Sequence, residues 1–167
     1  MIGDALRTGA LLGATMAMGL VAGAFALYAH TLMPGLRATD DRTFVATFQA
    51  IDRAIINPWF MVGGFLGAAV LTTVAALSNL GRPPLPWVCA ALALYLVAVV
   101  ITLAVNVPRN DAIKAAGEPD QIADLAWVRE QFDEARWAAF NLVRVALTST
   151  AFACLAWALV LHGRSTA

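Results

Sequence analysis

Polar side chains that could perform chemistry stand near the ends of long apolar stretches of the sequence. The last of these stretches carries Trp137, Asn141 and Arg144 at steps of four and three residues, which place an indole, an amide and a guanidinium on one helix face. Arg144 lies well inside the stretch, where an unpaired charge costs at least ~2.5 kcal/mol in a membrane. It therefore needs a partner or water, or it extends to lipid headgroups while Trp137 joins the interfacial aromatic belt.

A second polar group ends the third apolar stretch. Asn106 and Asn110 are one helical turn apart with Pro108 between them, so we expect the helix either to kink or to end there. Backbone carbonyls freed in this way could bind a ligand or could be capped by the asparagines themselves. Arg109 and Asn57 belong to the same expected polar end of the protein.

His30 is near the end of the first apolar stretch. If the apolar stretches are helices packed side by side in a bundle, His162 lies at the opposite end of that bundle. One histidine at the polar end argues against a bis-histidine haem and leaves a metal site within one chain short of ligands. We predict no metal site, with a metal shared between subunits through His30 and Asp111 as the alternative. His30 itself is interpreted either as an interfacial side chain or as a general base.

Long helices in a membrane would bring these residues together. Of the 167 residues 60% are hydrophobic and 13% are charged, which is not the composition of a water-soluble domain. Apolar stretches of about twenty residues have the length that crosses a ~30 Å hydrocarbon layer. We predict an all-α fold, a single membrane domain over residues 1–167, built as a bundle of four transmembrane helices at residues 8–32, 58–80, 85–107 and 137–162.

Two further helices are predicted in the polar connections. The first, between residues 38 and 57, has an apolar face formed by Phe44, Phe48, Ile51 and Ile55, a pattern typical of a short helix along the membrane interface. The second, between residues 120 and 136, is expected to continue into the fourth span without a break. Pro34 and Gly35 are expected to end the first span.

An even number of spans returns the chain to its starting side, so the polar residues collect at one end of the bundle. Those expected there are His30, Asn57, Asn106, Arg109, Asn110, Asp111, Trp137, Asn141 and Arg144. The two long loops on this side carry more Lys and Arg than the opposite side, and the positive-inside rule therefore favours a cytoplasmic position for them. We expect a multi-pass integral membrane protein of the bacterial inner membrane.

Several classes of function do not fit this composition. The formal net charge is zero and no run of Lys or Arg occurs, so no nucleic-acid partner is expected. The sequence has no Gly-rich phosphate loop, no Cys-x-x-Cys, no His-Glu-x-x-His and no nucleophile elbow, so nucleotide cofactors are not expected. Hydroxyl groups are sparse at mid-span, which argues against a continuous polar pore.

Four short motifs follow one another along the chain: Met33-Pro34-Gly35-Leu36, Asn57-Pro58, Asn106-Val107-Pro108-Arg109-Asn110 and Trp137-x-x-x-Asn141-x-x-Arg144. In order and spacing, over nearly the whole chain, they resemble the anthrone-oxygenase-like family of small four-helix membrane proteins. The resemblance implies oxidation of anthrones to anthraquinones by molecular oxygen, without a recognised flavin or haem.

On this resemblance we expect a membrane-embedded oxygenase for a hydrophobic anthrone-like or quinone-like molecule that enters from the lipid. No cofactor is predicted besides oxygen as co-substrate, and a recruited metal is kept as an alternative. The expected catalytic residues are His30 as base together with Trp137, Asn141 and Arg144, and the expected substrate-binding residues are Asn57, Asn106, Arg109 and Asn110.

A non-catalytic membrane protein is the competing hypothesis. Glycines recur along the first span at small-xxx-small spacing, which permits close contact with another helix. Such a face would suit a homo-oligomer or an accessory subunit of a larger membrane complex.

Overall fold

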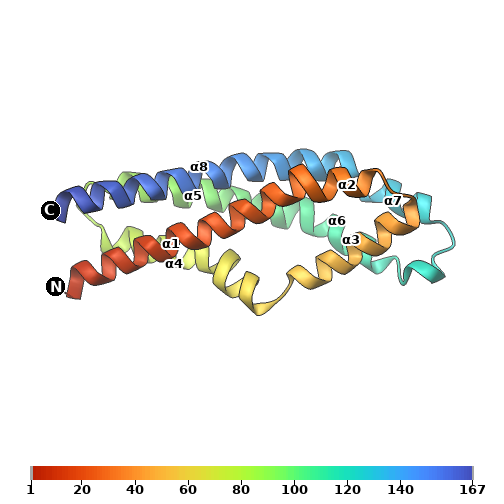
Figure 1. Cartoon of the computed structure of the whole chain (residues 1–167), viewed down its shortest axis with the longest axis horizontal. Helices are drawn as coiled ribbons and strands as arrows, with labels where there is room; N and C mark the ends of the chain where they lie inside the picture. The colour runs from red at the N-terminus through yellow and green to blue at the C-terminus, as the bar shows by residue number, and fades with distance from the viewer. Residues whose placement is uncertain (1, 167) are drawn as a thin grey trace.

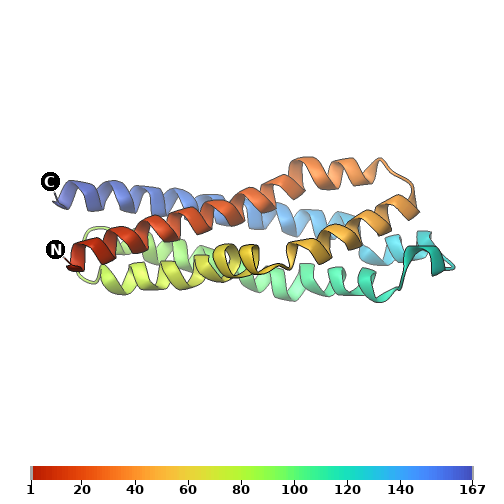
Figure 2. The same cartoon turned by 60° about the horizontal axis from the view of Figure 1, so that its bottom comes forward.

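The protein is an elongated bundle of helices with both chain ends at one end of the molecule (Figure 1, Figure 2). The structure is a computed structural model that describes residues 2–166, with side chains from residue 3 to residue 165. Within this range all regular secondary structure is helical and no strand occurs. Four helices form the long body of the molecule: α1 (Ile2–Leu27), α4 (Gly67–Ser78), α5 (Leu85–Ile101) and α8 (Glu134–Thr166).

Small side chains form much of the contact between these four helices. α1 lies against α4 and α8, and α5 lies against the same two helices. Each helix contributes an alanine that is 0% exposed, namely Ala14, Ala68, Ala91 and Ala151. Small residues allow close approach of helices, which matters where an apolar solvent supplies no hydrophobic driving force. Larger buried side chains fill the remaining space, including Leu11, Met18, Tyr95 and Leu155.

Four helical segments of the described chain are long and apolar enough to cross a membrane, by length and composition. They are Gly3–Arg37, Trp59–Ser78, Leu85–Ala115 and Leu125–Ser165. The second agrees closely with the predicted 58–80. The other three extend well beyond the predicted 8–32, 85–107 and 137–162, and the following features explain why.

The first and third segments continue through prolines that were expected to end or kink them. A proline lacks the N–H of a regular helix and its ring clashes with the carbonyl four residues earlier. Before each proline the helix widens into a π segment, η1 (Tyr28–Leu32) and η3 (Thr102–Asn106), in which Met33 and Val107 donate to carbonyls five residues back. The wider turn makes room for the ring. The chain then continues as α2 (Met33–Arg37) and α6 (Val107–Ala115), so the predicted stop at Pro34 and Gly35 is wrong.

Two capped helices complete the end of the bundle away from the termini. Asp40 begins α3 (Asp41–Ile55) and Asp124 begins α7 (Leu125–Phe132), each by accepting a backbone N–H three residues ahead at 2.9 Å. A short 3-10 helix, η4 (Pro119–Gln121), lies between α6 and α7. The predicted continuous helix into the fourth span is interrupted, because Asp133 adopts a left-handed conformation with φ of 52°.

The apolar face of α3 is buried on the protein rather than turned toward a membrane surface. Phe44 and Phe48 are 0% and 1% exposed, in a second core with Phe132 and Trp137. Gln49, also buried, donates to the carbonyls of Ile113 and Gly117. In Figure 1, α3 runs beside α2 and α7 along the length of the bundle. The predicted position of α3 along the membrane interface is therefore not what the structure shows.

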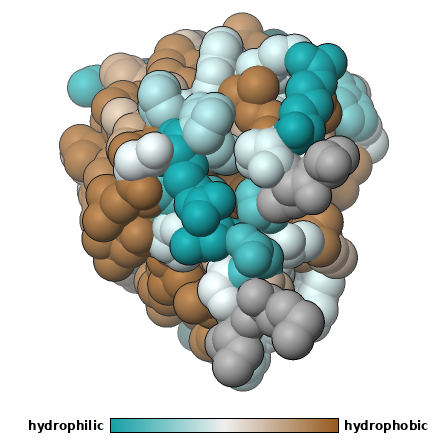
Figure 3. Space-filling view, turned by 90° about the vertical axis from the view of Figure 1, so that its left-hand side faces the viewer, coloured by the Kyte–Doolittle hydropathy of each residue, from teal (hydrophilic) through white to brown (hydrophobic). Residues whose placement is uncertain are grey.

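The opposite end of the bundle, which bears the termini, has its own polar contacts. Figure 3 views this end and shows hydrophilic residues through its middle with hydrophobic residues beside them. Arg7 donates to the Ser78 carbonyl at 2.9 Å, and the Thr8 hydroxyl lies 2.9 Å from His162 Nε2. These contacts join α1 to α4 and α8. They also place His162 far from the predicted site, as expected from the sequence.

Candidate functional site

A cavity of about 210 Å³ lies where the chain turns from α3 into the π segment η2 (Trp59–Leu66). This corner bows outward from the body of the bundle in Figure 1. The apolar and aromatic lining consists of Phe25, Tyr28, Ile55, Ile56, Phe60, Met61, Phe65, Leu103, Val107 and Trp137. The polar lining consists of Asp52, Thr102, Asn110, Asp111, Lys114 and Arg144. Walls of this kind suit a flat hydrophobic ligand with a few polar substituents.

Arg144 is a buried cation held by neutral groups. Its side chain is 4% exposed, donating from Nη2 to Asn141 Oδ1 at 2.9 Å and from Nη1 to Thr102 Oγ1 at 3.2 Å. The guanidinium carbon lies 4.2 Å from the ring centre of Phe25 and 5.5 Å from that of Trp137. This position does not fit an arginine that extends to lipid headgroups. Within residues 3–165 no carboxylate pairs with it, so the cavity offers an uncompensated positive charge.

Asn141 positions this arginine and joins two helices. It is 0% exposed and donates from Nδ2 to the carbonyl of Phe25 at 3.0 Å, while its Oδ1 accepts from Arg144. The amide thus fixes α8 against α1 and sets the direction of the guanidinium. Asn141 does not itself line the cavity.

A hydrogen-bonded chain runs from Trp137 in the cavity wall toward solvent. Trp137 Nε1 donates to Asn110 Oδ1 at 2.8 Å, and Asn110 Nδ2 donates to Asp52 Oδ1 at 2.6 Å. Lys114 Nζ lies 2.7 Å from Asp52 Oδ2 and 3.1 Å from Asp111 Oδ1. The Asp52 side chain is only 7% exposed, whereas that of Asp111 is 63% exposed. Asp52 is therefore the buried carboxylate of the cavity.

Sequence reasoning missed Asp52 although a signal for it is present. Asp52 follows Phe44 and Phe48 at further steps of four residues, so all three lie on one stripe of α3. All three are buried in the structure. From the sequence, only apolar residues were counted on this face of the helix, and Asp52 was therefore left out of the candidate site.

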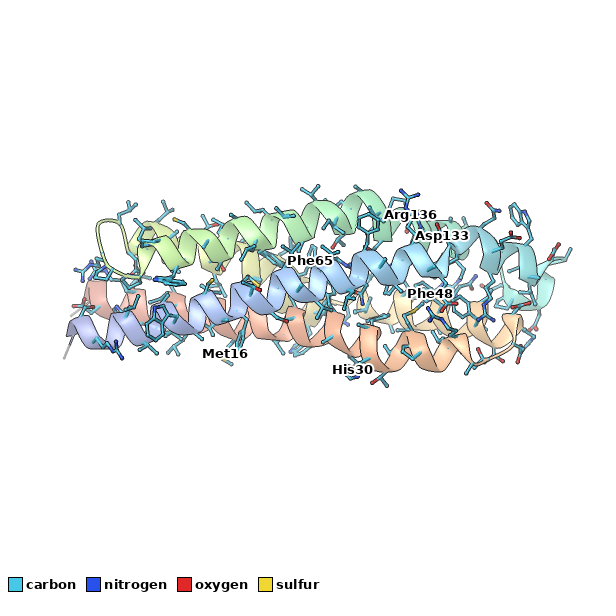
Figure 4. All side chains as sticks on the ribbon, turned by 90° about the horizontal axis from the view of Figure 1, so that it is seen from above. Met16, His30, Phe48, Phe65, Asp133 and Arg136 are labelled. Carbon is cyan, nitrogen blue, oxygen red and sulfur yellow. The ribbon has the colours of Figure 1, made fainter. Side chains whose placement is uncertain are left out.

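The structure does not bring His30 or Asn57 into the cavity. His30 is exposed, and its Nδ1 lies 2.6 Å from the hydroxyl of Thr31. In Figure 4 the labelled His30 points outward from the edge of the bundle, whereas Phe48 and Phe65 lie inside it. Asn57 caps the start of η2, accepting from Phe60 N at 3.0 Å and donating to the Ala54 carbonyl at 2.9 Å. Their expected roles as base and substrate ligand do not fit these positions.

Asn106 and Arg109 hold helices together beside the cavity rather than lining it. Asn106 is 1% exposed and donates to the carbonyl of Trp137 at 3.2 Å. Arg109 donates to the Val105 carbonyl at 2.9 Å and lies 3.7 Å from the carboxylate of Asp133. These contacts fix the π segment η3 and the start of α6 against α8. Of the predicted residues, Asn110, Trp137 and Arg144 line the cavity, with Asn141 directly behind Arg144.

The ligand types that could hold a metal ion do not gather in this region. Among the residues that the structure describes, no group of three or more His, Cys, Asp or Glu side chains lies close enough to do so.

Fold and cavity together define a class of protein: an all-helical bundle with four long apolar helices and an amphipathic cavity that contains a buried arginine. The chain belongs to the anthrone oxygenase family, whose sequence profile matches residues 53–154. This match confirms the family resemblance, and its range contains Asn110, Trp137, Asn141 and Arg144. No curated protein and no solved structure matches the chain.

Proposed function

We propose that the protein is a membrane-embedded oxygenase that binds a phenolic aromatic molecule of the anthrone type in this cavity and oxidises it with molecular oxygen. The observation that carries the proposal is Arg144, a buried cation that pairs with no carboxylate of residues 3–165 and that lines a cavity with aromatic walls. Membership of the anthrone oxygenase family supports the same reaction class.

The size and opening of the cavity suit a hydrophobic substrate. A dry apolar cavity of about 150 Å³ binds benzene, so about 210 Å³ with an open side leaves room for a larger planar ring system. Ile56 and Leu103 line the cavity and remain 60% and 61% exposed. Part of the exposed lining is therefore apolar, and a lipid-dissolved substrate would enter there without crossing water.

The overall reaction balances without a further reductant. An anthrone CH₂ group and O₂ give a quinone C=O group and one water molecule, and the four electrons lost by carbon reduce the O₂. Loss of one C–H proton gives a carbanion whose charge spreads onto oxygen, and this anion forms the C–O bond with O₂. The peroxide anion takes up a proton to give a hydroperoxide. Loss of the second C–H proton then breaks the O–O bond and releases hydroxide, which takes up a further proton as water. Arg144 would stabilise the negative oxygen at each stage.

In this proposal the four apolar segments cross the membrane and the opposite ends lie in water. Large apolar side chains face outward along α4 and α5, including Val70, Leu77, Leu96 and Val100, which is compatible with lipid contact. The proposed orientation keeps the two long polar connections in the cytoplasm, because they carry the larger share of Lys and Arg. The proposed location of the protein is the bacterial inner membrane.

The first experiment uses purified protein in mild detergent, with its absorption spectrum and metal content recorded beforehand. An anthrone is added under air while oxygen uptake and quinone formation are followed together. We expect one O₂ consumed per quinone formed. Arg144→Gln is expected to lower turnover roughly 10²–10³-fold, the usual cost of removing one donor to a developing oxyanion.

Arg136→Gln is the matched control, because Arg136 is an exposed arginine on the same helix that does not line the cavity and lies at the edge of the bundle in Figure 4. It is expected to keep wild-type turnover. No oxygen uptake by the wild type, together with a partner protein that co-purifies in fixed ratio, would overturn the proposal and favour an accessory subunit.

A further inference from the structure

The charges that line the cavity are unevenly paired. Lys114 contacts two carboxylates, Asp52 at 2.7 Å and Asp111 at 3.1 Å. Arg144 contacts only neutral groups of the described chain. The group around Lys114 therefore has one negative charge in excess, whereas Arg144 lacks an anionic partner.

Asp52 is the cavity group best placed to receive a proton. Its carboxylate is buried, lines the cavity and is held by Asn110 and Lys114. Lys114 is engaged as a cation between two carboxylates, and amide or hydroxyl groups such as Asn110 and Thr102 are poor bases. Asp111 is largely exposed, so water competes for its carboxylate.

We propose that Asp52 is the catalytic base, which takes the acidic proton from a ligand whose resulting negative oxygen faces Arg144. The inference rests on the proposed function in that it takes the ligand to be a weakly acidic phenol or anthrone. The C–H or O–H bond of the ligand breaks, an O–H bond forms on Asp52, and the electron pair stays on the ligand. The total charge of the cavity and its ligand stays the same. The negative charge is on Asp52 before the transfer and on the ligand oxygen beside Arg144 afterwards.

This proton transfer leaves each of the two cations, Lys114 and Arg144, with one anionic partner. Lys114 retains Asp111 as its partner, and Arg144 gains an anion. Coulomb interactions are strong in a poorly solvated cavity. Attraction to the unpaired Arg144 therefore stabilises the ligand anion and favours ionisation of the ligand. Lys114 can pass one of its own protons to the exposed Asp111 and then take the proton from Asp52, which gives the proton a way to solvent after the reaction.

The test begins without oxygen and uses a hydroxyanthraquinone whose colour changes when its phenol ionises. It is bound to the purified protein in weakly buffered solution, and the phenolate formed is compared with the protons released. For the wild type we expect bound phenolate with no proton released, and a new infrared carbonyl band of a protonated carboxyl group. Asp111→Asn is expected to keep this band.

Asp52→Asn is expected to lose the carbonyl band and to bind the probe either as neutral phenol or as phenolate with one proton released. Retained probe binding shows that the variant is folded. With an anthrone under air, its turnover is expected to fall roughly 10²–10⁴-fold, the range for loss of a general base. Asp41→Asn, on the same helix but paired with Arg129 away from the cavity, is the control expected to behave as wild type.

The two proposals fail in different ways. If the wild type releases one proton per phenolate, or if Asp52→Asn keeps the carbonyl band or full turnover, Asp52 is not the base, even in an active oxygenase. If the probe results are as expected but no anthrone consumes oxygen, Asp52 accepts protons in a protein that is not an oxygenase.

Discussion

At the scale of single residues, the two opposite charges of the cavity do not pair with each other. Arg144 is held by Asn141, Thr102 and the face of Phe25, while Asp52 is held by Asn110 and Lys114. Aromatic faces attract a guanidinium by about 0.5–2 kcal/mol but do not neutralise it. Each charge is thereby oriented toward the cavity with capacity left for a ligand, which is what a site for an ionising substrate requires.

His30→Ala tests whether the base is Asp52 and not His30. His30 is exposed and bonded to its neighbour Thr31, so its loss should not alter the cavity. We expect oxygen uptake with an anthrone to stay within about tenfold of the wild type, whereas loss of a general base costs roughly 10²–10⁴-fold. A larger loss in a variant that still binds the hydroxyanthraquinone would return His30 to the mechanism.

At the scale of helices, three π segments contribute side chains to the cavity lining. η1 contributes Tyr28, η2 contributes Phe60, Met61 and Phe65, and η3 contributes Thr102 and Leu103. Two of these segments end two residues before the prolines at 34 and 108. π turns often occur at functional sites because the extra residue changes which side chains face inward. The prolines therefore shape the cavity without lining it.

The start of α3 gives a prediction about pH. The backbone N–H and hydroxyl of Thr43 donate to the Asp40 carboxylate and hold its pKa below the usual value near 4. A lowered pKa in the folded state means that the charged cap stabilises α3 above the ordinary carboxyl pKa. That stabilisation is lost as the pH falls through the lowered value.

We expect amide-exchange protection in the first turn of α3 to fall in acid for the wild type relative to Asp40→Asn. Asparagine caps a helix about as well as aspartate but does not ionise, so the variant should lack this pH dependence. Equal pH profiles for the two proteins would show that the charge of Asp40 contributes nothing to the cap.

At the scale of the whole molecule, the bundle is longer than a membrane is thick. α8 has 33 residues, which corresponds to roughly 50 Å against a ~30 Å hydrocarbon layer. The second core, built around Phe44, Phe48 and Phe132, occupies the end away from the termini. This end would project into water, and the cavity would then lie close to the membrane boundary, where lipid and a polar end are both within reach.

Cysteine labelling tests this arrangement. In a background with Cys89 and Cys154 replaced by serine, we would introduce Asp120→Cys in the long polar connection or Arg82→Cys in the turn between α4 and α5. With a membrane-impermeant maleimide, Asp120→Cys is expected to label only from the cytoplasm and Arg82→Cys only from outside. Labelling of both from one side would contradict a membrane crossing by the segment Leu85–Ala115, which lies between the two positions.

The long helices, the shared face of the α8 residues and the family were predicted correctly from local sequence, whereas the helix stop at Pro34 and the unbroken helix through Asp133 were not. Apolar runs of sufficient length specify four long helices, because burial of apolar side chains follows composition over a window. Trp137, Asn141 and Arg144 share one helix, so their spacing alone places them on one face, and the structure brings Trp137 and Arg144 to one cavity. The family was also recognisable from short motifs, and the profile match confirms it.

Which side chains meet across helices was decided only by the tertiary structure. A π turn adds one residue and so rotates the residues beyond it by about 100°. His30 lies within such a turn and faces outward, and no periodicity in the sequence shows where the turn occurs. Asp52 reaches Asn110 and Lys114 because α3 folds back onto α6, a contact between segments about sixty residues apart. The sequence by itself therefore determined the long helices and identified Arg144 as a site residue. Only the packing of α3 in the tertiary structure brings Asp52 into the same cavity.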